Sequence, residues 1–314
     1  MIRTVLGDIR PDELGLCYSH EHVVIDHSYP TVQNEELLLN DLDKISEELT
    51  RFYNLGGRSV IDTMPVDAGR NIRMLAEISR RTGVHIIAAT GIHLEEYYLP
   101  NHWRYHYSED KLAGLFIDDI EKGIDVYDYN GPVIERSSHK AGIIKLATGD
   151  GPISPHQKKI FRAVVNVHKQ TGVPILTHTN YGRQALAQIE MFNKLGANLS
   201  HVVLSHVDRY KDVNYNREIL QSGVYVEYDS AFRWQADEEN WTYRLLRELL
   251  EDFPGQITMG MDAAKHKYWK SYGGSPGLDF LLSTFKVDME EMGLSQYYEN
   301  IFYENPARLF EIEK

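Results

Sequence analysis

The sequence predicts an α/β fold, a (β/α)8 TIM barrel, on three observations. Short β-branched runs alternate with amphipathic helical segments, and there are eight such runs. No glycine-rich phosphate loop follows the first run, as an open doubly wound sheet would favour. The predicted strands are 16–22, 59–63, 85–90, 142–146, 175–178, 202–206, 224–228 and 257–261.

The intervening segments carry apolar side chains three to four positions apart, which predicts helices. Ser154 and Pro155 are typical of an N-cap followed by proline in the first turn. One helix is predicted from Leu38, Leu42, Ile45, Leu49 and Phe52, and another from Leu112, Phe116, Ile120 and Ile124. Six glycines that precede strands are predicted to end helices in a left-handed cap: Gly57, Gly83, Gly172, Gly196, Gly223 and Gly255.

Composition limits the class of protein. With 314 residues, 42% of them hydrophobic, and no linker or change in composition, we expect a single domain over 1–314. A formal net charge of -13 repels phosphate backbones and anionic lipid, which argues against nucleic acid and membranes as partners. Cys17 is the single cysteine, so no intrachain disulfide is possible. The start lacks a signal-peptide pattern and no apolar run approaches the ~20 residues of a membrane span, so we expect a cytoplasmic protein.

Potential metal ligands fall at the ends of several predicted strands. His20 and His22 are two residues apart, so they point to the same face of the first strand, while Glu21 points away. Strand 5 ends at His178, strand 6 ends at His206, strand 8 runs into Asp262, and strand 4 carries Lys145. Chemistry in a TIM barrel belongs at this end of the strands. A lone histidine there is more often a hydrogen-bonded core residue, but the joint placement is more specific. We interpret most other histidines, His93 among them, as surface or packing residues.

Lys145 is the unusual member of the set. An amine that points into a barrel is desolvated and tends to lose its proton. Reaction with carbon dioxide would convert it to a carbamate, whose two oxygens could bridge two cations roughly 3.5–4 Å apart. The alternative is a lysine that extends along the barrel rim to solvent.

With these residues in view, the sequence resembles the phosphotriesterase family of the amidohydrolase superfamily. The likeness runs from residue 6 to residue 310. It rests on His20-x-His22, Lys145 after Gly-Ile-Ile, His178 after Ile-Leu-Thr, His206 after Val-Leu-Ser, Asp262 after Gly-Met, and the terminal segment 304–310.

The resemblance implies two divalent metal ions, zinc or alternatively manganese, cobalt or iron. His20, His22 and Asp262 would hold the more buried ion, and His178 and His206 the more exposed one. Carboxylated Lys145 and a hydroxide would bridge them, and Asp262 would also be catalytic as a proton shuttle. Some relatives carry glutamate at the strand-4 position; the lysine places this chain with those that use a carbamate. Relatives are commonly dimers, so we expect a homodimer, for which the aromatic-rich segment 97–107 could serve.

Loops, rather than fold and metals, decide the substrate. The loop after strand 8 is basic and polar, and further cations follow strands 6 and 7. In a chain of net charge -13 these cations predict a small anionic substrate. We expect a phosphate clamp of Arg209, Arg233, Lys265 and Tyr268, with Tyr97 or, as the substrate-binding choice, Tyr98 lining the same mouth. Lys267 and Lys270 are interpreted as solvated surface cations.

This pattern is similar to the branch of the family that hydrolyses phosphorylated furanose lactones. The resemblance implies ring-opening of the 1,4-lactone of a pentonic acid 5-phosphate. Alternatives with the same metal centre are an organophosphate triesterase or carboxylesterase, or an N-acyl-homoserine lactonase. A third hypothesis, a barrel that binds a metal and a ligand without turnover, would not need Asp262 as a proton shuttle.

Overall fold

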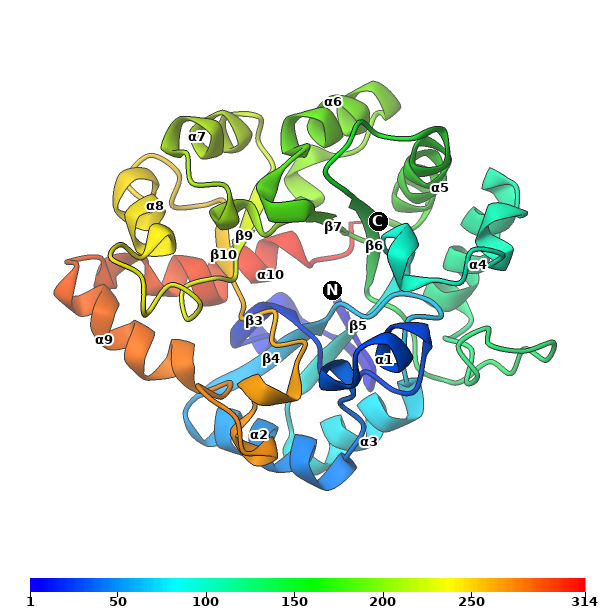
Figure 1. Cartoon of the computed structure of the whole chain (residues 1–314), viewed down its shortest axis with the longest axis horizontal. Coiled ribbons are helices and arrows are strands. Elements are labelled where there is room, and N and C mark those ends of the chain that lie inside the picture. Colours follow the sequence, from blue (N-terminus) through cyan, green and yellow to red (C-terminus); the bar gives the residue numbers. More distant parts are fainter. Residues whose placement is uncertain (314) are drawn as a thin grey trace.

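The computed structural model describes residues 1–313 and consists of a ring of parallel strands surrounded by helices (Figure 1). The strands pair in chain order from β3 to β10, and every neighbouring pair is parallel. This order confirms the predicted TIM barrel. The strands are β3 Leu16–Glu21, β4 Gly57–Asp62, β5 His85–Gly91, β6 Ile143–Thr148, β7 Ile175–Thr179, β8 Val202–Ser205, β9 Tyr225–Tyr228 and β10 Ile257–Met259.

The barrel closes where β10 meets β3. The backbone N–H of Asp262 donates to the carbonyl oxygen of His20 at 3.0 Å. At Gly260 a Cβ would lie 2.6 Å from that same carbonyl oxygen, so only glycine permits this approach. The closure therefore places Asp262 directly beside His20.

Helices cover the outside of the barrel (Figure 1). Those that follow the strands are α2 Leu42–Asn54, α3 Ile72–Thr82, α4 Glu109–Glu121, α5 Pro155–Thr171, α6 Ala185–Leu195, α7 Val213–Gln221 and α8 Trp241–Leu249. The remaining helices are α1 Tyr29–Gln33, α9 Thr284–Glu291 and α10 Asn305–Leu309. None of the helices in the described part of the chain has the length and apolar character that a membrane crossing requires.

Two helix boundaries differ from the prediction. Helix α2 begins at Leu42, where the Asp41 side chain caps it by accepting hydrogen bonds from the backbone amides of Asp43 and Lys44. Leu38 lies outside the helix and has an extended backbone. Helix α4 ends at Glu121, before Ile124. The start of α5 is as predicted: Ser154 caps it in a reciprocal pair of hydrogen bonds with Gln157.

The glycine predictions are partly confirmed. Gly83, Gly172 and Gly196 are left-handed helix caps, and Gly223 also has a positive φ. The predictions for Gly57 and Gly255 are wrong, since neither has a positive φ. Gly57 instead begins β4, and a Cβ there would lie 2.3 Å from the ring of Phe52, so the ring's packing is what requires glycine.

The interior of the barrel has its own apolar core, which is plugged at one end. A short antiparallel hairpin of β1 Ile2–Thr4 and β2 Gly7–Ile9, which the sequence analysis did not predict, brings Ile2 to this core. Leu309 and Phe310 reach it from α10. The strand residues of the inner core are Cys17, Ile61, Ile87, Ala89, Ile143, Leu176, Val203 and Tyr225. Because this end is filled with apolar side chains, polar chemistry is confined to the opposite end.

Candidate metal centre and cavity

The six predicted ligands come together at the carboxyl ends of the strands. His20 lies in β3, Lys145 in β6 and His178 in β7, while His22, His206 and Asp262 follow β3, β8 and β10. Five of the six line one cavity of about 490 Å³, and His20 is fully buried beside them. The strand period of two and the parallel topology together produce this convergence.

The candidate ligand atoms of His20, His22 and Asp262 lie close to one another. The Oδ1 atom of Asp262 lies 3.2 Å from Nε2 of His22 and 3.8 Å from Nε2 of His20. His206 packs against both neighbouring histidines, with ring centroids 4.9 Å from His20 and 4.7 Å from His178. These rings therefore form a continuous row of imidazoles, and the Asp262 carboxylate lies beside it.

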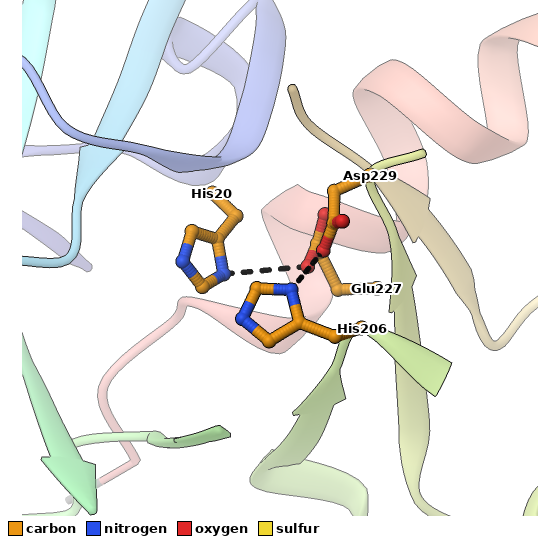
Figure 2. A group of neighbouring side chains, drawn as sticks. All are labelled: His20, His206, Glu227 and Asp229. Carbon is orange, nitrogen blue, oxygen red and sulfur yellow. Dashed lines mark hydrogen bonds and ion pairs between the residues drawn. The ribbon is translucent and has the colours of Figure 1, made fainter. Parts of the chain in front are cut away.

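In His20 and His206, the Nδ1 nitrogen of the imidazole already contacts other side chains of the protein (Figure 2). Nδ1 of His20 lies 3.0 Å from the Ser205 hydroxyl and 3.3 Å from Oε2 of Glu227. Nδ1 of His206 contacts the Asp229 carboxylate in a very short hydrogen bond. Such partners fix the ring orientation and leave Nε2 free for a metal. We interpret the buried group His20, His206, Glu227 and Asp229 in this way.

Glu227 and Asp229 belong to the candidate site, and neither was predicted from the sequence. They lie two apart at the end of β9, so they point to the same side as the other candidate ligands. The rule that found His20 and His22 could have found this pair as well. Burial, followed by the neighbouring Asp229, raises the pKa of Glu227 well above its usual range.

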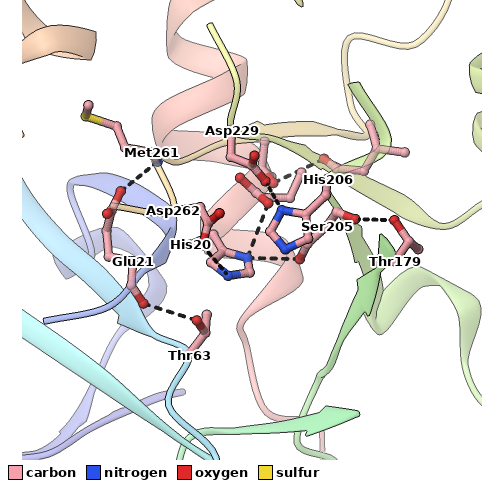
Figure 3. A network of polar contacts seen from close by, with 12 residues as sticks. His20, Glu21, Thr63, Thr179, Ser205, His206, Asp229, Met261 and Asp262 are labelled. Atoms are coloured by element: carbon pink, nitrogen blue, oxygen red, sulfur yellow. Dashed lines mark hydrogen bonds and ion pairs between the residues drawn. The ribbon is translucent and has the colours of Figure 1, made fainter. Parts of the chain in front are cut away.

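A hydrogen-bonded frame holds Asp262 in place (Figure 3). Its backbone is in the left-handed region with a φ of 47°, which is strained for a residue with a side chain. The buried Glu21 carboxylate accepts hydrogen bonds from the amides on either side, at 2.7 Å from Met261 and 3.3 Å from Ala263. Glu21 thus faces away from the cavity, as expected, and clamps the residue that faces into it.

The residues fit the metal that this donor set implies. Nε2 of His20 and Nε2 of His178 are buried and have no hydrogen-bond partner among residues 1–313. A buried nitrogen without a partner is costly, and a bound cation would satisfy it. Imidazole and carboxylate together suit zinc and other divalent transition metals. Burial also holds the pKa of His20 and of His178 well below the usual range, which keeps both in the neutral form that binds metal.

Lys145 does not extend to solvent. Its side chain is 1% exposed, which excludes the rim position that was considered from the sequence. Burial lowers the pKa of Lys145 to about 8, although Asp262, Asp62 and Glu227 act in the opposite direction. Burial therefore favours the neutral amine, which is the form that reacts with carbon dioxide.

The four residues of the predicted phosphate clamp all line the cavity. Arg209 donates to Asp262 Oδ2 at 2.6 Å and pairs with Asp229, and Arg233 donates to the same Asp262 oxygen at 3.1 Å. Burial would raise the pKa of Asp262, but His206, His22 and the two guanidinium groups hold it well below its usual range. Lys265 forms an ion pair with Glu36, in the segment after β3, and Tyr268 packs edge-on against Phe232.

The choice of Tyr98 at the mouth needs correction. Tyr98 is 3% exposed, and its hydroxyl accepts from the His93 amide and donates to the Val66 carbonyl oxygen. The structure places Tyr97 at the cavity instead. In the 3-10 turn that follows β5, adjacent side chains point in different directions, and strand periodicity does not apply there.

His93 also lines the cavity, although it was not among the predicted site residues. Its ring stacks on Tyr97 at 4.2 Å and meets His178 edge-on at 4.9 Å. Its Nδ1 is buried without a hydrogen-bond partner in the described residues. It lies two residues beyond the end of β5, so its position at a strand end was the signal that could have identified it.

Comparisons with known proteins agree with this geometry. The model of the Phosphotriesterase family matches residues 1–310. The chain belongs to the phosphotriesterase family. It is accordingly a hydrolase, in a family whose members depend on metal ions.

Similar proteins cover almost the whole chain. A protein of Mycoplasmopsis synoviae called phospho-furanose lactonase is 28% identical over 99% of this chain and 92% of its own length. The crystal structure of a lactonase from Listeria monocytogenes is 30% identical, with a TM-score of 0.91, covering 100% of this chain and 99% of that one. A phosphotriesterase homology protein from Escherichia coli, solved with phosphate in its active site, is 28% identical with a TM-score of 0.84 and covers 96% and 100% of the two chains.

Proposed function

We propose that this protein hydrolyses the 1,4-lactone of a pentonic acid 5-phosphate, opening the ring to the phosphorylated sugar acid. The observation that carries the proposal is a cavity in which the candidate metal ligands lie beside Arg209, Arg233 and Lys265, in a chain of net charge -13. The similarity to a phospho-furanose lactonase and to a lactonase supports the same substrate class. Phosphate in the active site of the similar Escherichia coli protein supports an anionic ligand.

His20, His22 and Asp262 would hold one divalent ion, and His178 and His206 the other, with a carboxylated Lys145 between them. Such ions supply a water acidic enough to attack at neutral pH and polarise the lactone carbonyl. We propose zinc as the metal.

Asp262 is the residue that we propose moves the proton. Water adds its oxygen to the carbonyl carbon, the bond from that carbon to the ring oxygen breaks, and one proton must reach the departing oxygen. Asp262 Oδ2 is held by Arg209 and Arg233, so its carboxylate has a fixed orientation towards the cavity. It would accept the proton of the water and pass it to the ring oxygen.

Lys265 and Tyr268 are the residues that we propose bind the phosphate group. Arg209 and Arg233 are committed to Asp262, so their contribution to the anion would be mainly electrostatic. Among residues 1–313, the Lys265 ammonium pairs only with the exposed carboxylate of Glu36, and it can turn towards a ligand. Tyr97 or His93 would contact the sugar ring, since both line the same cavity.

The test is hydrolysis of a panel of sugar lactones, each with and without a 5-phosphate, by protein supplied with divalent metal and bicarbonate. We expect a strong preference for the phosphorylated members. Replacing Lys265 with alanine should raise KM for a phosphorylated lactone much more than for its unphosphorylated analogue. Equal effects on both substrates would remove Lys265 from the phosphate site.

An apolar wall favours a second candidate with the same metal centre. Ile25, Leu37, Met64 and Leu94 line part of the cavity and would suit the acyl chain of an N-acyl-homoserine lactone or a neutral organophosphate triester. Faster turnover of these neutral substrates than of any phosphorylated lactone would establish this alternative.

A further inference from the structure

Three cations line the cavity besides Lys145, and each has a carboxylate partner, but the partners differ in kind. Arg209 pairs with Asp229 and Asp262, and Arg233 pairs with Asp262. These carboxylates are largely buried and orient the candidate metal centre. Breaking such a pair would leave a buried charge without a partner, which is strongly unfavourable. Neither arginine is free to exchange its partner for a ligand.

The partner of Lys265 is different. Its Nζ lies 3.0 Å from Oε2 of Glu36, and the side chains are 32% and 44% exposed. Nζ of Lys267 lies 3.5 Å from the same oxygen. Ion pairs this open to solvent contribute little to stability and are screened by salt. The Lys265–Glu36 pair can therefore dissociate at little cost in free energy when an anion that binds Lys265 more tightly is present.

The pair also lies at the rim of the cavity. Glu36 belongs to the loop between β3 and α2, and its neighbour Leu37 lines the cavity. Lys265 lies in the loop after β10 and lines the cavity as well. The contact therefore joins two loops that are far apart in the sequence, beside the cavity that Lys265 and Leu37 line.

We propose that Glu36 is an exchangeable counter-ion, which a phosphate group displaces from Lys265 and which thereby sets the selectivity for dianionic ligands. The inference rests on the proposed function and deepens it by naming a specificity-determining residue. A phosphate monoester carries about -1.5 to -2 charges at neutral pH and three acceptor oxygens, so it outcompetes a single carboxylate for the ammonium group. A monoanionic or neutral ligand has no such advantage.

The experiment measures the affinity of inorganic phosphate for the metal-loaded protein by calorimetry. In Glu36→Gln the competing carboxylate is gone, and we expect phosphate to bind more tightly by up to about fivefold, the most that an exposed ion pair usually supplies. The matched control is Glu35→Gln, which removes the same charge one residue away. Glu35 is exposed and makes no ion pair within residues 1–313. It should change phosphate affinity by much less.

A second background separates direct competition from a general charge effect. The double variant Lys265→Met with Glu36→Gln should bind phosphate with the same affinity as Lys265→Met alone. Equal affinities for Glu36→Gln and Glu35→Gln would overturn the inference, with phosphate then held by the metal centre alone. Tightening that persists without Lys265 would overturn it as well.

The test is independent of the lactone panel because it requires no turnover. If Glu36→Gln tightens phosphate binding but no phosphorylated lactone is hydrolysed, the proposed function fails and the counter-ion stands. If phosphorylated lactones are hydrolysed but phosphate affinity does not respond to Glu36, the counter-ion fails alone.

Discussion

Asp262 is the single residue on which most contacts of the candidate site converge. It faces His22, accepts hydrogen bonds from two arginines, and has a strained backbone. Its position depends on Glu21, whose carboxylate binds the amides on both sides of it. A carboxylate that points away from the cavity thus determines where a candidate ligand lies.

Replacing Glu21 with glutamine tests this dependence. An amide group has one acceptor oxygen where the carboxylate has two, so one of the two backbone amides loses its partner. We expect metal affinity to fall by about 10- to 100-fold, the usual effect of removing an outer partner of a ligand. Titration of the metal-free protein with zinc measures it. Unchanged affinity in a variant that folds normally would show that Asp262 is held by its other contacts.

At the scale of elements, two strand ends approach the ligand-bearing strands so closely that only glycine is tolerated. A Cβ at Gly91, the last residue of β5, would lie 1.9 Å from the carbonyl oxygen of Lys145. A Cβ at Gly260 would lie 2.6 Å from that of His20. The spacing of the barrel at its catalytic end is therefore set by these contacts as well as by the strand hydrogen bonds.

Replacement of Gly91 with alanine should displace the Lys145 backbone, because the added Cβ would overlap its carbonyl oxygen, and this displacement would disturb the pairing of β5 with β6. We expect lower stability and less than full metal loading. Gly114, in the interior of α4, has open space around a Cβ, and Gly114→Ala should instead raise the free energy of unfolding by up to about 1 kcal/mol. Urea unfolding and elemental analysis measure both effects. Full metal loading in Gly91→Ala would contradict the steric argument.

At the scale of the whole molecule, the candidate ligands join parts of the barrel that the chain visits far apart. They come from β3, β6 and β7 and from the segments that directly follow β3, β8 and β10. Metal bound here would connect the two strands at the closure, β3 and β10, to the opposite side of the ring. The other end of the barrel is filled by apolar side chains, so at this end polar contacts hold the strand ends together.

Removal of metal should therefore lower the melting temperature. A ligand that binds only the folded state, at a free concentration 1,000 times its dissociation constant, raises the free energy of unfolding by about 4 kcal/mol. Scanning calorimetry before and after treatment with a chelator, followed by addition of zinc, measures the loss and its recovery. The same melting temperature in protein shown by elemental analysis to be metal-free would argue against a metal that bridges these strands.

The barrel and the convergence of the six candidate ligands could be predicted because both depend on local pattern, whereas metal binding by these residues stays a prediction. Strand period, strand order and the position of His20, His22, Lys145, His178 and His206 at strand ends are properties of neighbours in the sequence. The metal identity, the homodimer and the cytoplasmic location stay predictions.

What local pattern could not settle are the contacts between loops. The choice between Tyr97 and Tyr98, the role of His93, and the pairing of Lys265 with Glu36 depend on how each loop folds back over the mouth. The reason Gly57 is glycine lies in the ring of Phe52 rather than in a helix cap. Repeating hydrogen bonds make strand and helix geometry a function of nearby residues, whereas a loop side chain is positioned by whatever the rest of the chain brings against it.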